Sequence, residues 1–370
     1  MLESLYTEAI KKKGTIIDQL DKYKESNLDI SKFWDDYNIP ESNKNFTIGA
    51  GDGSKSEKKF LSFYFYAVSA ESLIYNEKNS KDNLLKIESS DVNTMDYGKF
   101  SKDRIRNYMG LFEVKNALKA IKSYDIDYYL YDGSLLGDLI RPYPLETEIS
   151  QDIRFDVLDF AEDELNKEIN TIENHNVEVY SNNLVANALK NKFDKIRDNN
   201  DYKYLENILN YLENIEKLLV LANLLKYNDK IIAISKSSQA DDYFKSNIPD
   251  MALFDKFTQG TGYSYPKIKP VSDEKLKREF PVEDSFFKSL IFTIFYVRLE
   301  ENKNILKIEL PYKANKSKVE EIIEIISKDS TGGYPYLLKK AHHDVVIKNR
   351  DIEHLSKIIG IYEKTGREML

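Results

Sequence analysis

The feature that most constrains the fold of this sequence is a change of hydrophobic period along the chain. Some runs of strand length are rich in aromatic and β-branched residues, whereas other stretches place apolar residues three and four apart, as helices do. The strand-like runs occupy residues 46–54, 60–75, 125–134, 231–235, 289–300 and 304–312. Helical spacing covers residues 1–40, 101–123, 146–228, 316–328 and 351–365. This alternation predicts a mixed α/β fold.

The order of these segments also predicts the domain organisation. Residues 1–40 read as a helical N-terminal arm, and residues 41–145 together with 229–370 read as the α/β core. Residues 146–228 are polar and charged, keep helical spacing and separate the two parts of the core. We interpret them as an inserted helical hairpin, and two plain surface helices are the alternative.

Composition excludes several classes of protein and of site. The chain has 370 residues, of which 41 % are hydrophobic, and this is too apolar for a disordered protein. It has no Cys, so disulfides, thiolate zinc sites and cysteine nucleophiles are excluded, and a metal would need carboxylate, His or backbone oxygen ligands. No membrane-length apolar run or signal peptide is evident, which predicts a cytoplasmic protein with no membrane partner. A net charge of -8 argues against a protein that coats nucleic acid through its total charge.

Two copies of the tripeptide Asp-Gly-Ser lie at the ends of strand-like runs, and they begin at Asp52 and Asp132. Each is explained equally well as a turn, because Asp-Gly tolerates positive φ and Ser caps helices. However, Glu113 lies on the helical segment between them, and the order Asp, Glu, Asp is the one with which a ribonuclease H-like fold holds two divalent metals. The sequence therefore predicts that three carboxylates converge to bind Mg²⁺ or Mn²⁺ for phosphodiester hydrolysis.

Histidines and isolated basic residues are the remaining candidates for the site. His342, His343 and His354 lie near the C-terminus, and because adjacent side chains diverge, at most one of the first two should face a site. Lys236 follows the run 231–235 and is a candidate for phosphate binding, with a solvated surface role as the alternative. Arg298 lies inside a strand-like run, so it needs a partner if it is buried, and it is either a site residue or a structural one.

The first Asp-Gly-Ser lies in a glycine-rich segment. Gly49, Gly51 and Gly53 superficially match a dinucleotide fingerprint, but that fingerprint needs a helix next, and strand-like residues follow here. No GxxxxGK[ST] phosphate loop is present in the chain. Basic residues near this segment predict a local basic groove at the mouth of an otherwise acidic protein. They are Lys55, Lys58, Lys59 and, from a core strand, Lys236.

Five motifs, taken together and in order, resemble the NurA family of DNA end-resection nucleases. They are IGAGDGS with Asp52, MGLFEVKNALKA with Glu113, YLYDGSLLGDL with Asp132, IAISKSS with Lys236, and GYPYLLKKAHHDVVI with His342, within residues 45–360. The resemblance implies a ribonuclease H-like core and a Mn²⁺-dependent enzyme with single-strand endonuclease and 5′ to 3′ exonuclease activities. It also implies a homodimer that acts on single strands and resected duplex ends with the hexameric HerA translocase.

The resemblance further implies roles for individual residues. Asp52, Glu113, Asp132 and His342 would be metal ligands in a site that also contains Lys236. His343 departs from the family's Ala-His step, so the choice between the two histidines stays open. Two other interpretations also stay open: an actin-like ATPase or sugar kinase, which uses similar Asp-Gly hairpins, and a scaffold without enzymatic activity.

Overall fold

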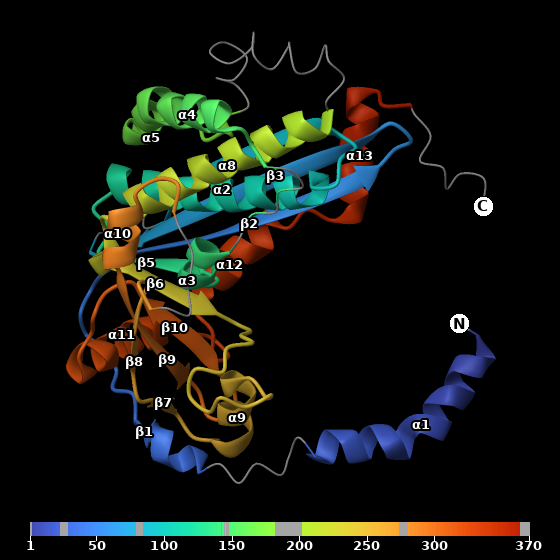
Figure 1. Cartoon of the computed structure of the whole chain (residues 1–370). Coiled ribbons are helices and arrows are strands. Elements are labelled where there is room, and N and C mark those ends of the chain that lie inside the picture. Colours follow the sequence, from blue (N-terminus) through green and yellow to red (C-terminus); the bar gives the residue numbers. More distant parts are fainter. Residues whose placement is uncertain are drawn as a thin grey trace.

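A computed structural model describes residues 2–22, 29–78, 84–141, 143, 145, 148–181, 202–273 and 280–362. In this part of the chain, ten strands form one mixed sheet in the order β1-β7-β9-β10-β6-β5-β2-β3-β4, and β8 pairs with β9 at its side. The strands are β1 Trp34–Asp36, β2 Thr47–Lys59, β3 Phe63–Asn76, β4 Leu84–Asp96, β5 Tyr128–Asp132, β6 Ile231–Ser235, β7 Gly262–Ser264, β8 Lys267–Pro270, β9 Ile291–Arg298 and β10 Leu306–Leu310. The predicted mixed α/β class is confirmed (Figure 1).

The centre of the sheet is parallel and its flanks are antiparallel. β5 pairs in parallel with both β2 and β6, and the other strand pairs in the described residues are antiparallel. β5 and β6 have five residues each, whereas β2, β3 and β4 form a long antiparallel ribbon that continues beyond them. The sheet is therefore stepped where β5 ends.

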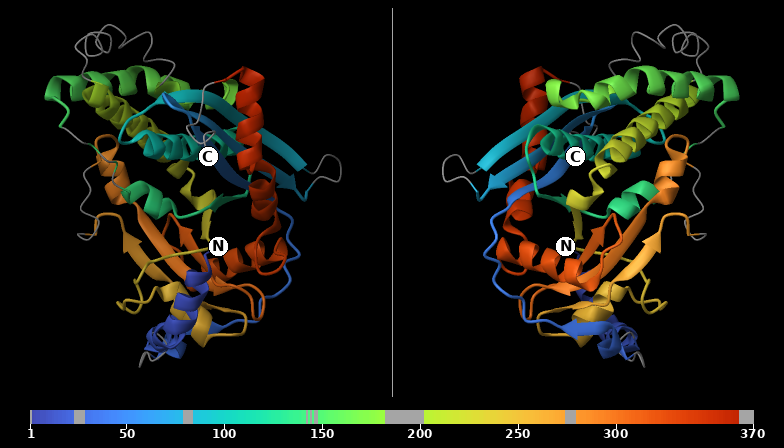
Figure 2. Two further views of the ribbon diagram at one scale, coloured as in Figure 1. Left: turned by 90° about the vertical axis from the view of Figure 1, so that its right-hand side faces the viewer. Right: turned by 90° about the vertical axis from the view of Figure 1, so that its left-hand side faces the viewer.

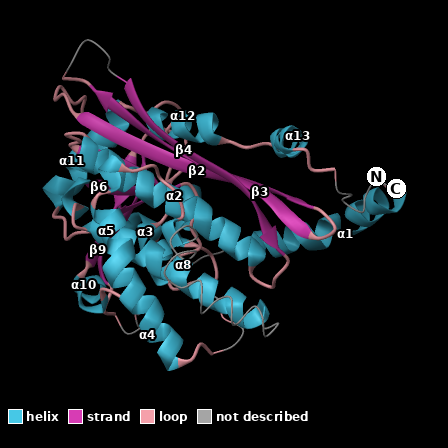
Figure 3. Cartoon of the chain, turned by 90° about the horizontal axis from the view of Figure 1, so that it is seen from above, coloured by secondary structure: helices cyan, strands magenta, loops and turns pink. Residues whose placement is uncertain are grey.

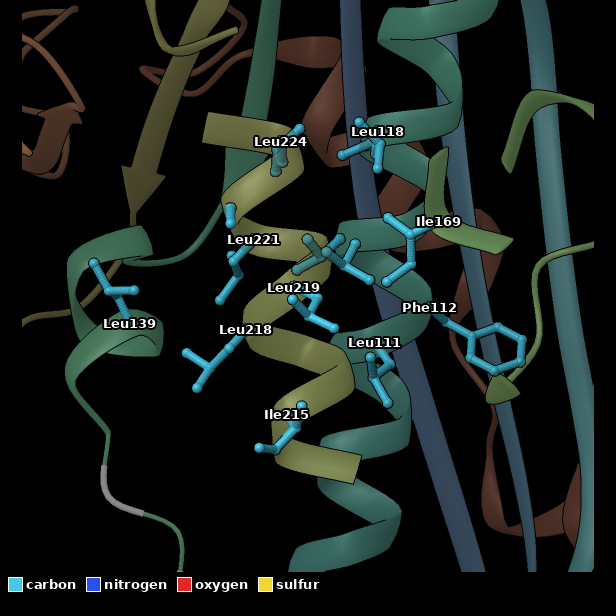
Figure 4. Packing of buried hydrophobic residues seen from close by; sticks show 14 of the residues in the cluster. Leu111, Phe112, Leu118, Leu139, Ile169, Ile215, Leu218, Leu219, Leu221 and Leu224 are labelled. Atoms are coloured by element: carbon cyan, nitrogen blue, oxygen red, sulfur yellow. The ribbon is translucent and has the colours of Figure 1, made fainter. Parts of the chain in front are cut away.

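One face of the sheet is covered by α2 (Ser101–Ser123), which in turn lies under α8 (Tyr202–Leu225). Leu111 and Leu118 of α2 and Leu218 and Leu221 of α8 belong to one hydrophobic cluster (Figure 4). Burying each such leucine contributes about 1.5–3 kcal/mol to the free energy of unfolding. α8 comes from the segment 146–228, so the second half of the predicted insertion shares its core with α2.

The same face carries a short α3 (Leu135–Ile140) after β5, and α4 (Gln151–Phe160), a π-helical turn (Ala161–Leu165) and α5 (Asn166–Asn170) lie beyond it. Short 3-10 turns follow at Ile172–Asn174 and precede β6 at Asn228–Lys230. The part of the predicted hairpin between 182 and 201 lies outside the described residues. The division into arm, core and insertion stays a prediction.

The opposite face is covered by three C-terminal helices, α11 (Lys316–Lys328), α12 (Tyr336–Val345) and α13 (Asn349–Ile359). α11 has an apolar stripe of valine and isoleucine that packs on the sheet, and α12 lies across β2 and β3. Seen from above in Figure 3, the strands separate α12 and α13 from α2 and α8, and the side views in Figure 2 show the same layers. The predicted helices near 316–328 and 351–365 are confirmed in type, and α12 was not predicted.

The N-terminal arm is helical only in part. α1 (Glu3–Lys22) stands apart from the rest of the molecule in Figure 1, but a 3-10 turn (Ile30–Phe33) and β1 join the far edge of the sheet through β7. α9 (Asp250–Phe257) packs beside them, and α10 (Asp284–Ser289) precedes β9. None of the helices in the described ranges is long and apolar enough to cross a membrane.

Candidate active site

Two aspartates lie side by side at the step in the sheet. The last register pair of β2 and β5 is Gly51 with Tyr131, and the next residue on each strand is Asp52 or Asp132. Because paired residues of parallel strands project from the same face, the two carboxylates lie on one face of the sheet. Burial, and next the charge of Asp132, raise the pKa of the Asp52 carboxyl above its usual value.

The prediction that Asp52 lies at the end of a strand is wrong. Asp52 lies inside β2, where it pairs with Glu71 of β3, and β2 continues to Lys59. The strand does not turn because β3 supplies antiparallel partners along its whole length, although its other neighbour, β5, stops. The second Asp-Gly-Ser matches its prediction: Asp132 ends β5, and Gly133 turns the chain with φ +116°.

Three glycines of β2 leave room for Tyr129 and Glu113. Gly49, Gly51 and Gly53 alternate with larger residues, so all three lie where a side chain would project from the face of the sheet opposite to the Asp52 side chain. A Cβ on Gly51 would lie 2.2 Å from the Tyr129 hydroxyl, and a Cβ on Gly53 would lie 2.6 Å from Cγ of Glu113. The missing side chain at Gly53 lets Glu113 approach the backbone beside Asp52, and those at Gly49 and Gly51 leave room for Tyr129. This spacing of glycines therefore serves close packing and not a dinucleotide.

Glu113 is an unusual carboxyl group. Burial first, and then the charges of Asp138, Asp52 and Asp132, raise its pKa well above the usual value, while Lys217 opposes this change. Within the described residues, the side chain of Glu113 makes no hydrogen bond. Such a group is protonated, or is neutralised by a cation, more readily than an exposed glutamate.

Lys236 and Tyr334 close the site around Asp132. Lys236, directly after β6, places Nζ 2.7 Å from Oδ2 of Asp132. The Tyr334 hydroxyl donates to the same oxygen at 3.4 Å, and Nζ of Lys236 lies 4.8 Å from the centre of the Tyr334 ring. Burial, followed by the charge of Asp132, raises the pKa of Tyr334. Tyr334 was missed by sequence reasoning, although it lies in the same motif as His342.

The structure distinguishes between the adjacent histidines. Nδ1 of His342 on α12 lies 2.6 Å from Oδ2 of Asp52, whereas the side chain of His343 is 91 % exposed. The chain just after α12 is anchored to the first Asp-Gly-Ser, because the Ile347 N–H donates to Oγ of Ser54 at 3.0 Å. α12 therefore places His342, and not His343, on Asp52.

Known proteins resemble this chain over most of its length. Residues 46–347 match the family model described as the NurA domain, which is more than half of the chain. The chain belongs to the NurA family.

Relatives in this family match along almost the whole chain. A Methanocaldococcus jannaschii protein named "Probable DNA double-strand break repair nuclease NurA" is 29 % identical over 98 % of this chain and 90 % of its own length. The DNA double-strand break repair nuclease NurA of Sulfurisphaera tokodaii is 28 % identical over 98 % of this chain and 97 % of its own.

Two solved structures of the family have the same fold. The NurA nuclease from Sulfolobus solfataricus superposes with a TM-score of 0.72 and 22 % identity over 97 % of each chain. A second NurA crystal structure, described as bound to dAMP and manganese, gives a TM-score of 0.68 and 19 % identity over 100 % of each chain.

The chemistry of this NurA-family site fits a hard divalent cation. Carboxylates and an imidazole are suitable ligands, and a cation would offset the burial, and next the repulsion from neighbouring carboxylates, that raise the pKa of Asp52 and Glu113. As the side chains stand, however, no three Asp, Glu or His residues form a ready-made metal site among the residues that the structure describes. Asp52 is paired with His342 and Asp132 with Lys236, so these contacts would be exchanged on binding.

Two further sequence predictions concern residues outside this cluster. Arg298 is only 2 % exposed and bonds to Asp255 and Thr258, so it anchors α9 and does not reach the site. Lys55 pairs with Glu57 at 2.8 Å on β2. Lys58 and Lys59 lie over the aromatic rings of Phe60 and Tyr97. The predicted basic groove stays a prediction.

Proposed function

We propose that this chain is a divalent-metal-dependent DNA nuclease with a ribonuclease H-like core. Its site binds Mn²⁺ or Mg²⁺, as two ions, through Asp52, Glu113, Asp132 and His342. The observation that carries this proposal is the β2–β5 register, which puts Asp52 beside Asp132 while Gly53 admits Glu113. Family membership makes the chain a deoxyribonuclease that repairs double-strand breaks, because curated members are named for this activity. The related NurA crystal structure described as bound to manganese supports the choice of metal.

The residues of the site have different roles in phosphodiester hydrolysis. Bound divalent ions supply a clamp for the attacking and leaving oxygens. Lys236 lies at the open side of Asp132, with its side chain 44 % exposed, and is placed to bind a non-bridging phosphate oxygen. His342 contacts Asp52 on one side and solvent on the other, so its imidazole either ligates a metal or passes a proton to the departing oxygen.

The proposed substrates are single strands and the ends of resected duplexes, which the enzyme would cut internally and degrade from 5′ to 3′. The resemblance to the NurA family supports these finer activities. Because the chain carries a net charge of -8, few counterions would be released on binding, so we expect weak intrinsic affinity for DNA.

The alternatives have less support. An actin-like ATPase or sugar kinase needs two complete core domains, whereas the described strands form one continuous sheet. A scaffold without enzymatic activity gives no reason for the raised pKa values of Asp52 and Glu113. Neither alternative accounts for the match to the NurA family model.

The proposal is tested with single-stranded DNA labelled at either end. We expect cleavage with Mn²⁺ or Mg²⁺, none with EDTA, and a ladder of fragments whose labelled end reports the direction of degradation. ATP and sugars should neither bind nor affect the rate. Cleavage that continues in EDTA would contradict metal dependence, and nucleotide binding without cleavage would favour the kinase alternative.

We also propose a homodimer that works with a hexameric HerA translocase. A motor that feeds DNA to the site would compensate for weak intrinsic affinity by raising the local concentration of strand. α1 offers an apolar surface for such docking, since Leu2, Tyr6 and Ile10 are 72 %, 59 % and 76 % exposed. In the described structure these side chains do not pack on the core. A cytoplasmic location stays a prediction.

Deleting residues 1–12 tests this surface. We expect the shortened chain to remain folded, because the deleted side chains are exposed, and to retain metal-dependent cleavage while capture by immobilised HerA is lost. Cleavage rates, pull-down and molar mass by light scattering are measured for both forms. Unchanged pull-down would move the docking surface elsewhere, and loss of folded protein would show that the arm stabilises the core.

A further inference from the structure

A buried carboxylate from another strand holds the turn that follows Asp132. Glu309 lies on β10, two strands from β5, and is 0 % exposed. Its Oε1 accepts the Ser134 hydroxyl at 2.7 Å, and its Oε2 accepts the backbone N–H of Leu136 at 3.0 Å. Oγ of Ser134 in turn accepts the Gly137 N–H at 2.9 Å and so caps α3. One side chain thus connects β10 to the second Asp-Gly-Ser and to the start of α3.

A third donor completes this contact. Nζ of Lys307, two residues earlier on the same face of β10, lies 2.8 Å from Oε1 of Glu309, and Lys307 is itself buried. Three donors therefore converge on a carboxylate that offers only acceptors. Any shift of the turn would leave buried polar groups without partners, which is costly. The turn is consequently held in one position.

The turn determines where the side chains of the site lie. Gly133 donates its N–H to the Ile234 carbonyl at 2.9 Å, so the residue after Asp132 is bound to β6 on one side and, through Ser134, to Glu309 on the other. α3 carries Asp138, which accepts the Tyr131 hydroxyl at 2.9 Å and is an electrostatic neighbour of Glu113. A movement of α3 would therefore disturb both sides of the metal centre.

We propose that Glu309, supported by Lys307, is a positioning residue of the metal centre. It directs the Asp132 carboxylate and the N-terminal end of α3, and it contacts neither metal nor substrate. The inference rests on the proposed function, because it assigns Glu309 a role through the metal ligand Asp132.

The test compares Glu309→Gln with the wild type. The amide keeps the shape of the side chain, but either of its orientations opposes an NH₂ group to at least one of the three donors. We expect calorimetry without DNA to show Mn²⁺ affinity weakened about tenfold, the size typical of changes behind metal ligands. The kcat for cleavage at limiting Mn²⁺ should fall, and KM for the DNA strand should stay unchanged, because no group facing DNA has been altered.

Glu213→Gln is the matched control. Glu213 is also 0 % exposed and also accepts bonds from several donors, those of Arg104 and Tyr108, but it lies between α2 and α8. We expect it to lower the thermal midpoint without changing Mn²⁺ affinity. Weakened binding in Glu309→Gln alone supports the proposal. If Mn²⁺ affinity falls in both variants in step with stability, Glu309 is merely structural and the proposal is overturned.

Ser134→Ala keeps the test decisive if Glu309→Gln fails to fold. It removes the hydroxyl that joins the turn to Glu309 and that also caps α3, so a several-fold loss of Mn²⁺ affinity in a folded protein supports the proposal. If the variant that folds keeps the wild-type Mn²⁺ affinity, the inference about Glu309 is overturned, whereas the proposed function is not. A wild-type chain that neither binds Mn²⁺ nor cuts DNA would overturn the proposed function, and this inference with it.

Discussion

Replacing Asp52, Glu113 or Asp132 singly by its amide is expected to reduce metal-dependent DNA cleavage by at least about a thousandfold. Each amide keeps the shape of its carboxyl group but removes the charge that holds a divalent ion. The variants should therefore fold normally. Rates are measured on single-stranded DNA over a range of Mn²⁺ concentrations, and a variant with wild-type activity would remove that residue from the site.

Although Glu113→Gln should lower cleavage activity, it should raise the stability of the metal-free protein. Because the pKa of Glu113 is raised in the folded state, its proton is retained at pH values where the unfolded chain has lost it, and folding becomes less favourable as pH rises above the usual value of 4.5. Glu113→Gln mimics the protonated form. In EDTA, its thermal midpoint should match the wild type near pH 4 and exceed it at pH 8.

Glu173→Gln provides a control of opposite sign. A hydrogen bond from Lys122 lowers the pKa of Glu173, so this carboxylate contributes stability above the usual value of 4.5, which is lost as pH falls. Its amide should be no more stable than the wild type at pH 8. If Glu113→Gln also lost stability there, the raised pKa of Glu113 would be contradicted.

His342→Ala should lower turnover about a hundredfold, whereas His343→Ala should change it by less than about twofold. The reason is that His342 bonds to Asp52 at 2.6 Å, while the side chain of His343 lies almost wholly in solvent. Single-turnover rates at saturating Mn²⁺ measure this difference. Equal losses would indicate a structural role for the pair, and a larger loss at His343 would show that the histidine motif is displaced by one residue.

Much of the fold was predictable because its signals are local. The alternation of period 2 with helical spacing identified β2, β3, α2, β5, β6 and the last two core strands, and it led to the mixed α/β class. The motif order also predicted that Asp52, Glu113 and Asp132 share one neighbourhood. In the structure, the charges of Asp52 and Asp132 add to burial and to the charge of Asp138 in raising the pKa of Glu113. Their roles in catalysis stay predictions until the variants are measured.

The sequence by itself determined the central strands, the helix α2 and the order in which the acidic residues occur, since these depend on neighbours in the chain. Only the tertiary structure decided that Asp52 lies in the middle of a strand, because this depends on pairing with β3. It also decided that His342 faces Asp52 and that Glu309 holds the turn after Asp132. His342 and Asp52 are 290 positions apart in the chain, and Glu309 and Ser134 are 175 positions apart. No local sequence pattern encodes which distant side chain a folded sheet will bring near.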